Sequence, residues 1–201
     1  MPGSHTYQLN EIMELVILTN PKAILDVGCG FGKFGVLCFE RLNYWYMPDG
    51  KTPVNDYKNR NVVIDAVEAF SEYITPVHEY VYNTIYINNI NTILEDINKK
   101  YDLVLLIDVL EHFTREEGER VIKKFLQISR NIIISTPKNI GVQKDSFGNK
   151  FEEHKTQWCK EDFVKFGNYF VIKNPFSYIV YLGKDLERVR SSSCYFREVW
   201  K

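Results

Sequence analysis

The chain has 201 residues, of which 45% are hydrophobic, and a formal net charge of −1 at pH 7. This length suits one domain with a sizeable core, so we expect a single domain over residues 1–201. The near-neutral charge gives no general attraction to polyanions, which disfavours a nucleic-acid partner without excluding one. No apolar run approaches the roughly 20 residues that span a membrane. A polar N-terminus and four cysteines without paired or metal-ligand spacing favour a cytoplasmic protein with reduced thiols.

The predicted elements alternate between helices and strands. An amphipathic helix within residues 1–20 precedes the first strand, and seven strands are expected at 23–27, 62–67, 84–87, 103–107, 131–135, 169–173 and 178–182. Helices are predicted at 33–42, 71–80, 92–98, 115–128 and 160–166, the second of them interrupted near Pro76, and polar loops at 43–61 and 138–157. This order predicts an α/β, Rossmann-like, mostly parallel sheet with helices on both faces and an antiparallel C-terminal hairpin.

The most informative segment joins the first strand to the helix at Lys33. It reads Asp26-Val27-Gly28-Cys29-Gly30-Phe31-Gly32, with a glycine at every second position. Glycine suits a turn with positive φ or a close approach to a ligand, and such a turn presents free N–H groups to an anionic or nucleotide-like molecule. A dinucleotide fingerprint counted from Gly28 needs glycine or alanine where Lys33 stands, which disfavours a nicotinamide-dependent oxidoreductase.

This acid followed by G-x-G-x-G resembles motif I of class I S-adenosylmethionine-dependent methyltransferases, and the element order resembles their fold over nearly the whole chain. The resemblance implies S-adenosylmethionine as the cofactor. It places Gly28, Gly30 and Gly32 beside the methionine part, with Asp26 orienting the amino group directly or through water.

The same resemblance assigns residues after the second and third strands. Glu68 would bind the two ribose hydroxyls, because a carboxylate can accept two hydrogen bonds from a vicinal diol. Asn89 would bond the adenine amino group, although Asn88 and Asn91 compete for that role, and Ile90 would pack on the ring. The alternative for Glu68 is an ordinary solvated side chain at a strand end.

The fourth strand is followed by Asp108-Val109-Leu110-Glu111-His112-Phe113. This segment resembles the motif after strand four in small-molecule O-methyltransferases, including the ubiquinone-biosynthesis group. The resemblance places Asp108 at the cofactor, and Glu111 and His112 become the catalytic candidates. Histidine is suited to take a proton near neutral pH, although His112 could equally cap or pack at the pocket wall.

A second, narrower similarity is to small-RNA 3′-end 2′-O-methyltransferases. It is carried by the strand-four segment, by Ser135-Thr136-Pro137-Lys138-Asn139, and by the stretch from His154 through Trp158 to Phe163. That resemblance implies a divalent metal held by Asp108, Glu111, His112 and His154. The chain departs from the pattern in having Asp at 108 instead of Glu and in the inserted Lys138. We leave metal binding open and assign no metal ligand.

These features together predict an S-adenosylmethionine-dependent methyltransferase acting on an oxygen of a small-molecule or sugar-like acceptor. The N-terminal helix and the loops at 43–61 and 138–157 would build the acceptor side. Two alternatives stay open: a metal-assisted RNA 2′-O-methyltransferase, and a catalytically silent cofactor-binding regulatory module. The sequence indicates neither the particular acceptor nor the oligomeric state.

Overall fold

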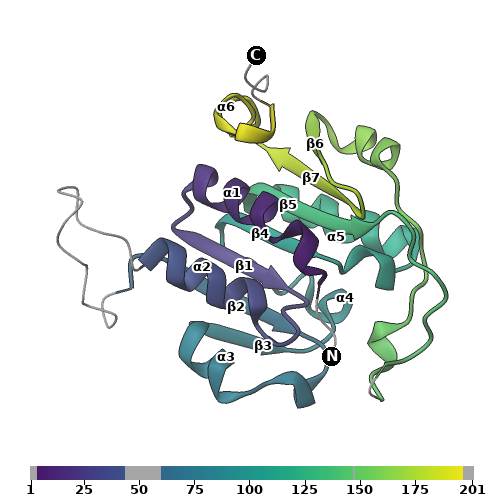
Figure 1. Cartoon of the computed structure of the whole chain (residues 1–201). Coiled ribbons are helices and arrows are strands. Elements are labelled where there is room, and N and C mark those ends of the chain that lie inside the picture. Colours follow the sequence, from purple (N-terminus) through teal and green to yellow (C-terminus); the bar gives the residue numbers. More distant parts are fainter. Residues whose placement is uncertain (1–3, 44–59, 147, 197–201) are drawn as a thin grey trace.

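A mixed β-sheet runs through the middle of the protein (Figure 1). The computed structural model describes residues 4–43, 60–146 and 148–196. The strands are β1 Ala23–Val27, β2 Val63–Glu68, β3 Thr84–Ile87, β4 Tyr101–Ile107, β5 Ser129–Pro137, β6 Tyr169–Lys173 and β7 Ser177–Gly183. Their order in the seven-stranded sheet is β3-β2-β1-β4-β5-β7-β6. The first five are parallel, and β7 lies antiparallel between β5 and β6, so the predicted fold class is confirmed.

Helices cover both faces of this sheet. They are α1 Leu9–Thr19, α2 Lys33–Asn43, α3 Pro76–Val81, α4 Ile90–Ile93, α5 Arg115–Ile128 and α6 Leu186–Ser192. Shorter 3₁₀ turns are η1 Thr6–Gln8, η2 Ser71–Tyr73, η3 Leu110–His112, η4 Lys150–Glu152, η5 Lys160–Phe166 and η6 Cys194–Phe196. In Figure 1, α1 and α2 lie in front of the sheet and α5 lies behind it. Among the described residues, no helix combines the length and apolar character that crossing a membrane requires.

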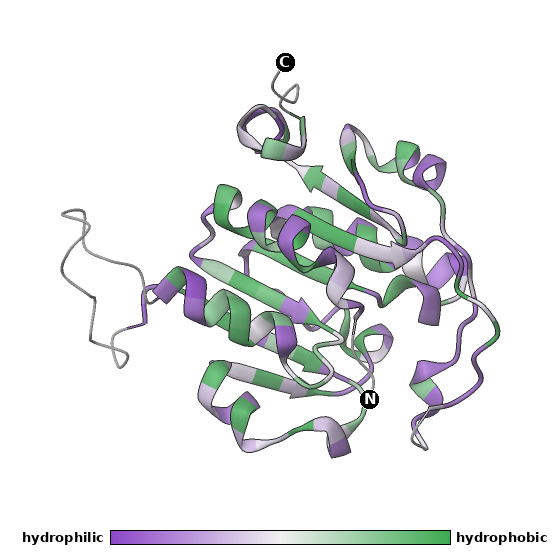
Figure 2. Ribbon diagram, viewed as in Figure 1, coloured by the Kyte–Doolittle hydropathy of each residue, from purple (hydrophilic) through white to green (hydrophobic). Residues whose placement is uncertain are grey.

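Two apolar clusters form the core, one on each face of the sheet. The strands are strongly hydrophobic in Figure 2, and the burial of β4 is nearly continuous, as expected for a strand covered on both faces. One cluster packs the sheet against α1, α2 and α6 through residues such as Ile12, Cys38 and Val189. The other packs it against α5 and η5 through residues such as Phe125 and Phe163. Each of the two predicted helix layers therefore packs on the sheet through its own buried apolar cluster.

The start of α5 shows how a local signal sets a helix boundary. Thr114 accepts a hydrogen bond from the Glu117 N–H at 3.3 Å, and Glu117 accepts one from the Thr114 N–H at 2.9 Å. This reciprocal pair is a capping box, which satisfies two N–H groups that the first helical turn leaves free. The helix consequently spans Arg115–Ile128, as predicted from the sequence.

The interruption predicted near Pro76 is confirmed: the segment 71–80 forms η2 and α3, because Pro76 has no N–H to donate and begins α3. Other helices differ from the prediction. The helix expected at 92–98 is the single turn α4, which starts earlier because the Asn89 side chain accepts the Asn91 N–H at 2.9 Å. Helix 160–166 forms as a 3₁₀ helix, and α6 was not predicted. Most of the predicted loop 43–61 lies outside the described residues.

The register of the strands brings the polar strand ends to one edge of the sheet. Val27 of β1 pairs with Val67 of β2 and with Leu106 of β4, and Ile107 pairs with Ser135 of β5. The residues that follow these strands therefore meet at the same edge, where open α/β sheets bind their ligands.

Candidate active site

A cavity of about 630 Å³ opens at the carboxyl-terminal edge of the parallel strands. Its walls come from the turn between β1 and α2, from the ends of β2 and β4, from α4, and from residues of the 138–157 loop. The lining includes most residues singled out from the sequence: Asp26, Gly28, Gly30, Glu68, Asn89, Ile90, Asp108, Glu111, His112 and His154. Gly32 does not line it and instead leads into α2.

The glycine turn has the backbone geometry that its sequence predicts. Gly28, Gly30 and Gly32 have φ angles of 67°, 54° and 79°, in the left-handed region that glycine adopts without strain. A Cβ on Gly28 would also lie 2.7 Å from a methyl group of Val109, so the turn packs closely against the segment after β4. The Gly28 N–H donates to the Val67 carbonyl at 2.8 Å, which ties the turn to the end of β2.

Glu68 stands at the junction of this turn and β2. Its side chain is buried and accepts the Gly30 N–H on Oε2 and the Phe70 N–H on Oε1, each at 2.9 Å. Burial raises the pKa of Glu68, and these backbone donors oppose the rise. Because each carboxylate oxygen can accept more than one hydrogen bond, both retain capacity toward the cavity. The side chain can therefore bind a vicinal diol while it holds the turn.

Asp26, the acid before the glycines, is almost fully buried. Its Oδ2 accepts a hydrogen bond from the Tyr82 hydroxyl at 2.7 Å. Burial raises the pKa of Asp26 to about 6, even though the Tyr82 hydrogen bond acts in the opposite direction. Tyr82 was not predicted, since it lies 56 residues away in the sequence with no local pattern to mark it.

Asn89 and Ile90 line the cavity beyond β3. Asn89 caps α4 through its side-chain oxygen, so that atom is engaged within the protein. Ile90 is buried and offers an apolar surface to the cavity. Asn88 and Asn91 line the same wall, so all three asparagines stay candidates for the predicted hydrogen bond to the adenine amino group.

Asp108 directly follows β4 and has a left-handed conformation with a φ of 53°, which aspartate tolerates better than most residues. Its Oδ2 accepts a hydrogen bond from Gln8 Nε2 at 2.7 Å, and its Oδ1 accepts one from Ser135 Oγ at 2.6 Å. Burial raises the pKa of Asp108 despite these two donors. Gln8 is a buried residue of the N-terminal segment, and sequence reasoning missed it.

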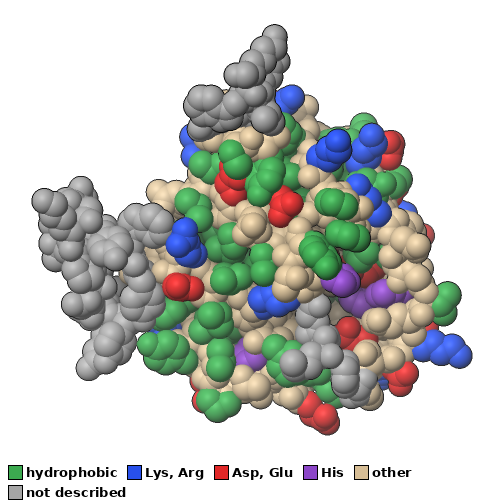
Figure 3. Space-filling view, in the orientation of Figure 1, with side chains coloured by type: hydrophobic (Ala, Val, Ile, Leu, Met, Phe, Trp, Pro, Cys, Tyr) green, Lys and Arg blue, Asp and Glu red, His purple; other side chains and the backbone are tan. Residues whose placement is uncertain are grey.

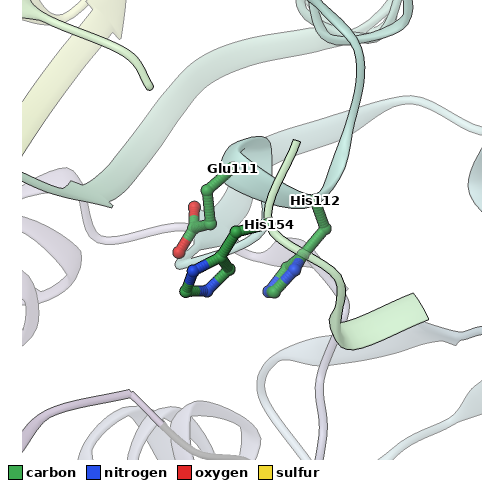
Figure 4. A group of neighbouring side chains, drawn as sticks. All are labelled: Glu111, His112 and His154. Atoms are coloured by element: carbon green, nitrogen blue, oxygen red, sulfur yellow. The ribbon is translucent and has the colours of Figure 1, made fainter. Parts of the chain in front are cut away.

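Glu111, His112 and His154 form a cluster that we call the Glu–His–His cluster (Figure 4). One potential ligand atom from each residue lies within 4.8 Å of the others. Among the described residues, no group forms a hydrogen bond with the buried atoms Glu111 Oε2 and His154 Nδ1, which is costly unless a ligand satisfies them. Asp108 does not belong to this group, so three of the four residues implied by the second resemblance converge.

Backbone hydrogen bonds hold the loop that carries His154 onto η3. The N–H groups of Lys155 and Thr156 donate to the Glu111 carbonyl at 2.7 and 3.2 Å. The indole of Trp158, which is fully buried, donates to the Leu110 carbonyl at 3.0 Å. The 154–158 segment is therefore fastened to the same short helix that supplies the other two members of the cluster.

His112 can offer a lone pair to a ligand. Its Nδ1 lies 3.2 Å from the Glu153 carbonyl, and a carbonyl can only accept, so Nδ1 carries the proton and Nε2 holds the lone pair. Burial lowers the pKa of His112 to about 4, so the ring is neutral at pH 7. Burial also raises the pKa of Glu111 well above its usual value, with the nearby Asp108 charge adding to the rise. A bound cation would reverse this effect on Glu111.

Glu152 is a further carboxylate in the cavity wall that sequence reasoning did not identify. It accepts a hydrogen bond from the Tyr73 hydroxyl at 3.3 Å, which joins the 138–157 loop to the segment after β2. Figure 3 shows histidine side chains reaching the surface beside carboxylates on this face of the molecule. The conformation of a long loop decides such contacts, and no spacing in the sequence encodes them.

The sheet order, the glycine turn and the position of this cavity define the fold of class I S-adenosylmethionine-dependent methyltransferases. No protein-family model and no curated protein matches the sequence. Solved structures do match.

The methyltransferase domain of bacterial CtHen1-CN matches over 89% of this chain and 98% of its own, with a TM-score of 0.58 and 14% identity. The N-terminal domain of EvdMO1 with S-adenosylhomocysteine bound matches over 89% and 81%, with a TM-score of 0.61 and 13% identity. The Synechocystis magnesium protoporphyrin IX methyltransferase ChlM with bound S-adenosylmethionine covers 90% and 85%, with a TM-score of 0.53 and 14% identity.

Proposed function

We propose that this protein is an S-adenosylmethionine-dependent methyltransferase that methylates an oxygen of a hydroxylated, sugar-like small molecule. The observation that carries the proposal is the shared cavity. The glycine turn and Glu68 form one wall, and the Glu–His–His cluster faces the same space. A cofactor site and a site for a hydroxylated acceptor are thus adjacent, as methyl transfer between two bound molecules requires.

The residues on the cofactor side fit S-adenosylmethionine. Glu68 has acceptor capacity for two ribose hydroxyls, Asp26 can meet a positively charged amino group, and Ile90 offers an apolar surface for a base. The cavity volume of about 630 Å³ is in the ordinary range for small-molecule sites. When bound, S-adenosylmethionine would supply a sulfonium methyl group: the acceptor oxygen bonds to the methyl carbon in line as the carbon–sulfur bond breaks, S-adenosylhomocysteine leaves with the electron pair, and the hydroxyl proton goes to a base.

The residues on the acceptor side fit a divalent metal. One carboxylate and two imidazoles are a ligand set that Mn²⁺ or Zn²⁺ accepts, and two of the three offer buried atoms without partners. A metal bound there would supply positive charge that favours an ionised hydroxyl on the acceptor. Without a metal, the Nε2 lone pair of His112 is the candidate to take the hydroxyl proton, as a weak base because burial lowers the pKa of this ring to about 4. Asp108 accepts hydrogen bonds from Gln8 and Ser135, and in this way it holds the segment after β4 in place.

A second candidate is methylation of the 2′-hydroxyl at an RNA 3′ end. The convergence of His154 with Glu111 and His112 favours it, since this is what the narrower resemblance implies. The net charge of −1 argues against it, because phosphate contacts dominate nucleic-acid affinity. A catalytically silent cofactor-binding module is the third possibility, and only a turnover measurement separates it from an enzyme.

The test is methyl transfer from radiolabelled S-adenosylmethionine to a panel of acceptors with Mn²⁺ present. The panel contains vicinal-diol sugars, single nucleosides, and an RNA oligonucleotide beside the same oligonucleotide with a 2′-deoxy 3′ end. We expect label on the small diols. Label on the RNA alone, absent from the deoxy control, would replace the proposal with the second candidate. Cofactor binding without transfer to any acceptor would favour the regulatory module, and failure to bind the cofactor would overturn the proposed function.

We predict that affinity for S-adenosylmethionine rises with pH and levels off above the pKa of Asp26, which burial raises to about 6. Below that pH the carboxyl group is neutral and loses its charge-assisted hydrogen bond to the amino group of the cofactor. Such a bond is worth roughly tenfold in affinity or more, so calorimetry between about pH 5 and pH 7 should resolve the change. The Asp26→Asn variant should bind weakly with a flat profile. A wild-type profile as flat as that of Asp26→Asn would remove Asp26 from the cofactor site.

A further inference from the structure

A buried histidine lies directly beneath the glycine turn. His78 belongs to α3, is fully buried, and does not line the cavity. Its Nε2 lies 2.8 Å from the Gly30 carbonyl oxygen, although the two residues are 48 positions apart. A Cβ on Gly32 would lie 3.4 Å from the same nitrogen, so the turn also packs on the face of the ring.

The partners of His78 determine where its proton sits. Nδ1 lies 3.1 Å from the Thr75 hydroxyl, which can donate or accept, and 3.1 Å from the backbone nitrogen of Thr75, whose N–H can only donate. Nδ1 therefore holds a lone pair, and in a neutral ring the proton is on Nε2. Nε2–H then donates to the Gly30 carbonyl, which can only accept. Only the neutral tautomer with its proton on Nε2 satisfies both the contact with the Thr75 N–H and the contact with the Gly30 carbonyl.

The peptide groups of Gly30 are consequently held from two sides. Its carbonyl accepts from His78 below the turn, and its N–H donates to Glu68 Oε2 at 2.9 Å beside the cavity. Gly30 has a φ of 54° and no Cβ, so its own backbone offers little resistance to other conformations. Tyr82, one helical turn beyond His78, holds Asp26 in a similar way through its hydroxyl.

We propose that His78 is a positioning residue that, as a fixed Nε2–H tautomer, holds the Gly30 peptide in the conformation that binds the methionine and ribose parts of the cofactor. The inference rests on the proposed function for its ligand, and it adds a residue that touches neither cofactor nor acceptor. A preorganised turn avoids the entropic cost of ordering a glycine segment when the ligand binds. Loss of the His78 hydrogen bond should therefore weaken cofactor binding and leave the chemical step unchanged.

The tautomer is tested on the wild-type protein by long-range ¹H–¹⁵N NMR of the imidazole rings, with and without S-adenosylhomocysteine. The expected signature of His78 is a protonated Nε2 and an unprotonated Nδ1 in both states, with slow exchange of the Nε2 proton. Protonation of Nδ1, or averaging between tautomers, would overturn the inference. This measurement does not depend on whether any variant folds.

The functional role is tested with His78→Phe and His78→Gln. Phenylalanine fills the space but donates nothing, whereas the glutamine amide can still donate to the Gly30 carbonyl. We expect His78→Phe to bind S-adenosylhomocysteine roughly tenfold more weakly, as for loss of one hydrogen bond, and His78→Gln to recover most of the affinity. In turnover, KM for S-adenosylmethionine should rise with kcat unchanged, and Mn²⁺ affinity should stay at the wild-type value.

The outcomes separate this inference from the proposed function. A wild-type protein that binds no S-adenosylhomocysteine, yet shows the Nε2–H tautomer, would overturn the proposed function. A wild-type protein that binds it, together with an equally tight and folded His78→Phe variant, would overturn the role of His78 alone. Equal weakening in His78→Phe and His78→Gln would show that the ring acts by packing instead of by its hydrogen bond, and would also overturn the inference.

Discussion

Replacing Glu68 with alanine should weaken binding of S-adenosylmethionine by about 1.5–3 kcal/mol, which is roughly ten- to 150-fold in affinity. The side chain can accept hydrogen bonds from two ribose hydroxyls while it accepts the N–H groups of Gly30 and Phe70. Alanine removes the bonds to the ligand and also leaves the Gly30 N–H without its partner. Isothermal titration calorimetry with S-adenosylhomocysteine measures the loss directly.

Two further variants separate hydrogen bonding from charge in this experiment. Glu68→Gln keeps the shape and one acceptor oxygen, so its affinity should fall between those of the wild type and Glu68→Ala. Glu152→Gln removes a negative charge from the same cavity without touching the glycine turn, and its effect should be small. Wild-type affinity in Glu68→Ala would show that the acid is only a strand-end side chain. Tighter binding of NAD than of S-adenosylhomocysteine would overturn the cofactor assignment as a whole.

The sheet was predictable because its signals are local. The apolar run of β1 and the turn at Asn174-Pro175 between β6 and β7 each lie within a few residues of the strand boundary that they set, and the capping box at Thr114 does the same for helix α5. The break at Pro76 was predicted for the same reason, since proline marks its own position. The helix at 92–98 was predicted less well, because the side chain of Asn89 acts on a single turn and outweighs the weak periodicity around it.

The partners within the site were not predictable in this way. Gln8 donates to Asp108 from 100 residues away, and His78 reaches Gly30 across 48. Neither residue belongs to a recognisable motif, and each becomes meaningful only after the sheet has brought its segment into place. His154 was accessible from sequence only through a family resemblance, because the loop that carries it is fastened by backbone hydrogen bonds to the Glu111 carbonyl. Such hydrogen bonds join backbone groups and depend little on which side chains the residues carry, so the sequence gives little sign of them.

Removal of divalent metal should abolish methyl transfer if the Glu–His–His cluster binds a metal. We expect EDTA to reduce turnover on the order of 100-fold, Mn²⁺ to restore it, and His154→Ala to show the same loss without EDTA. The physical reason is that His154 Nδ1 and Glu111 Oε2 are buried without partners, and a cation satisfies both at once. Metal binding can be measured separately by calorimetry with Mn²⁺ and by the Mn²⁺ electron paramagnetic resonance signal.

His154 is the informative position, because it joins the cluster from a separate loop, whereas Glu111 and His112 are neighbours on η3. His5→Ala is the matched control: His5 lines the same cavity but is not part of the cluster, so this variant should keep its Mn²⁺ affinity. Turnover that is unaffected by EDTA, together with no Mn²⁺ binding, would contradict the metal site. Glu111 and His112 would then be ordinary pocket residues, with the Nε2 lone pair of His112 as the candidate to take the hydroxyl proton. That result would also move the acceptor away from RNA ends and toward a small hydroxylated molecule, since metal assistance at the cluster is part of the RNA candidate.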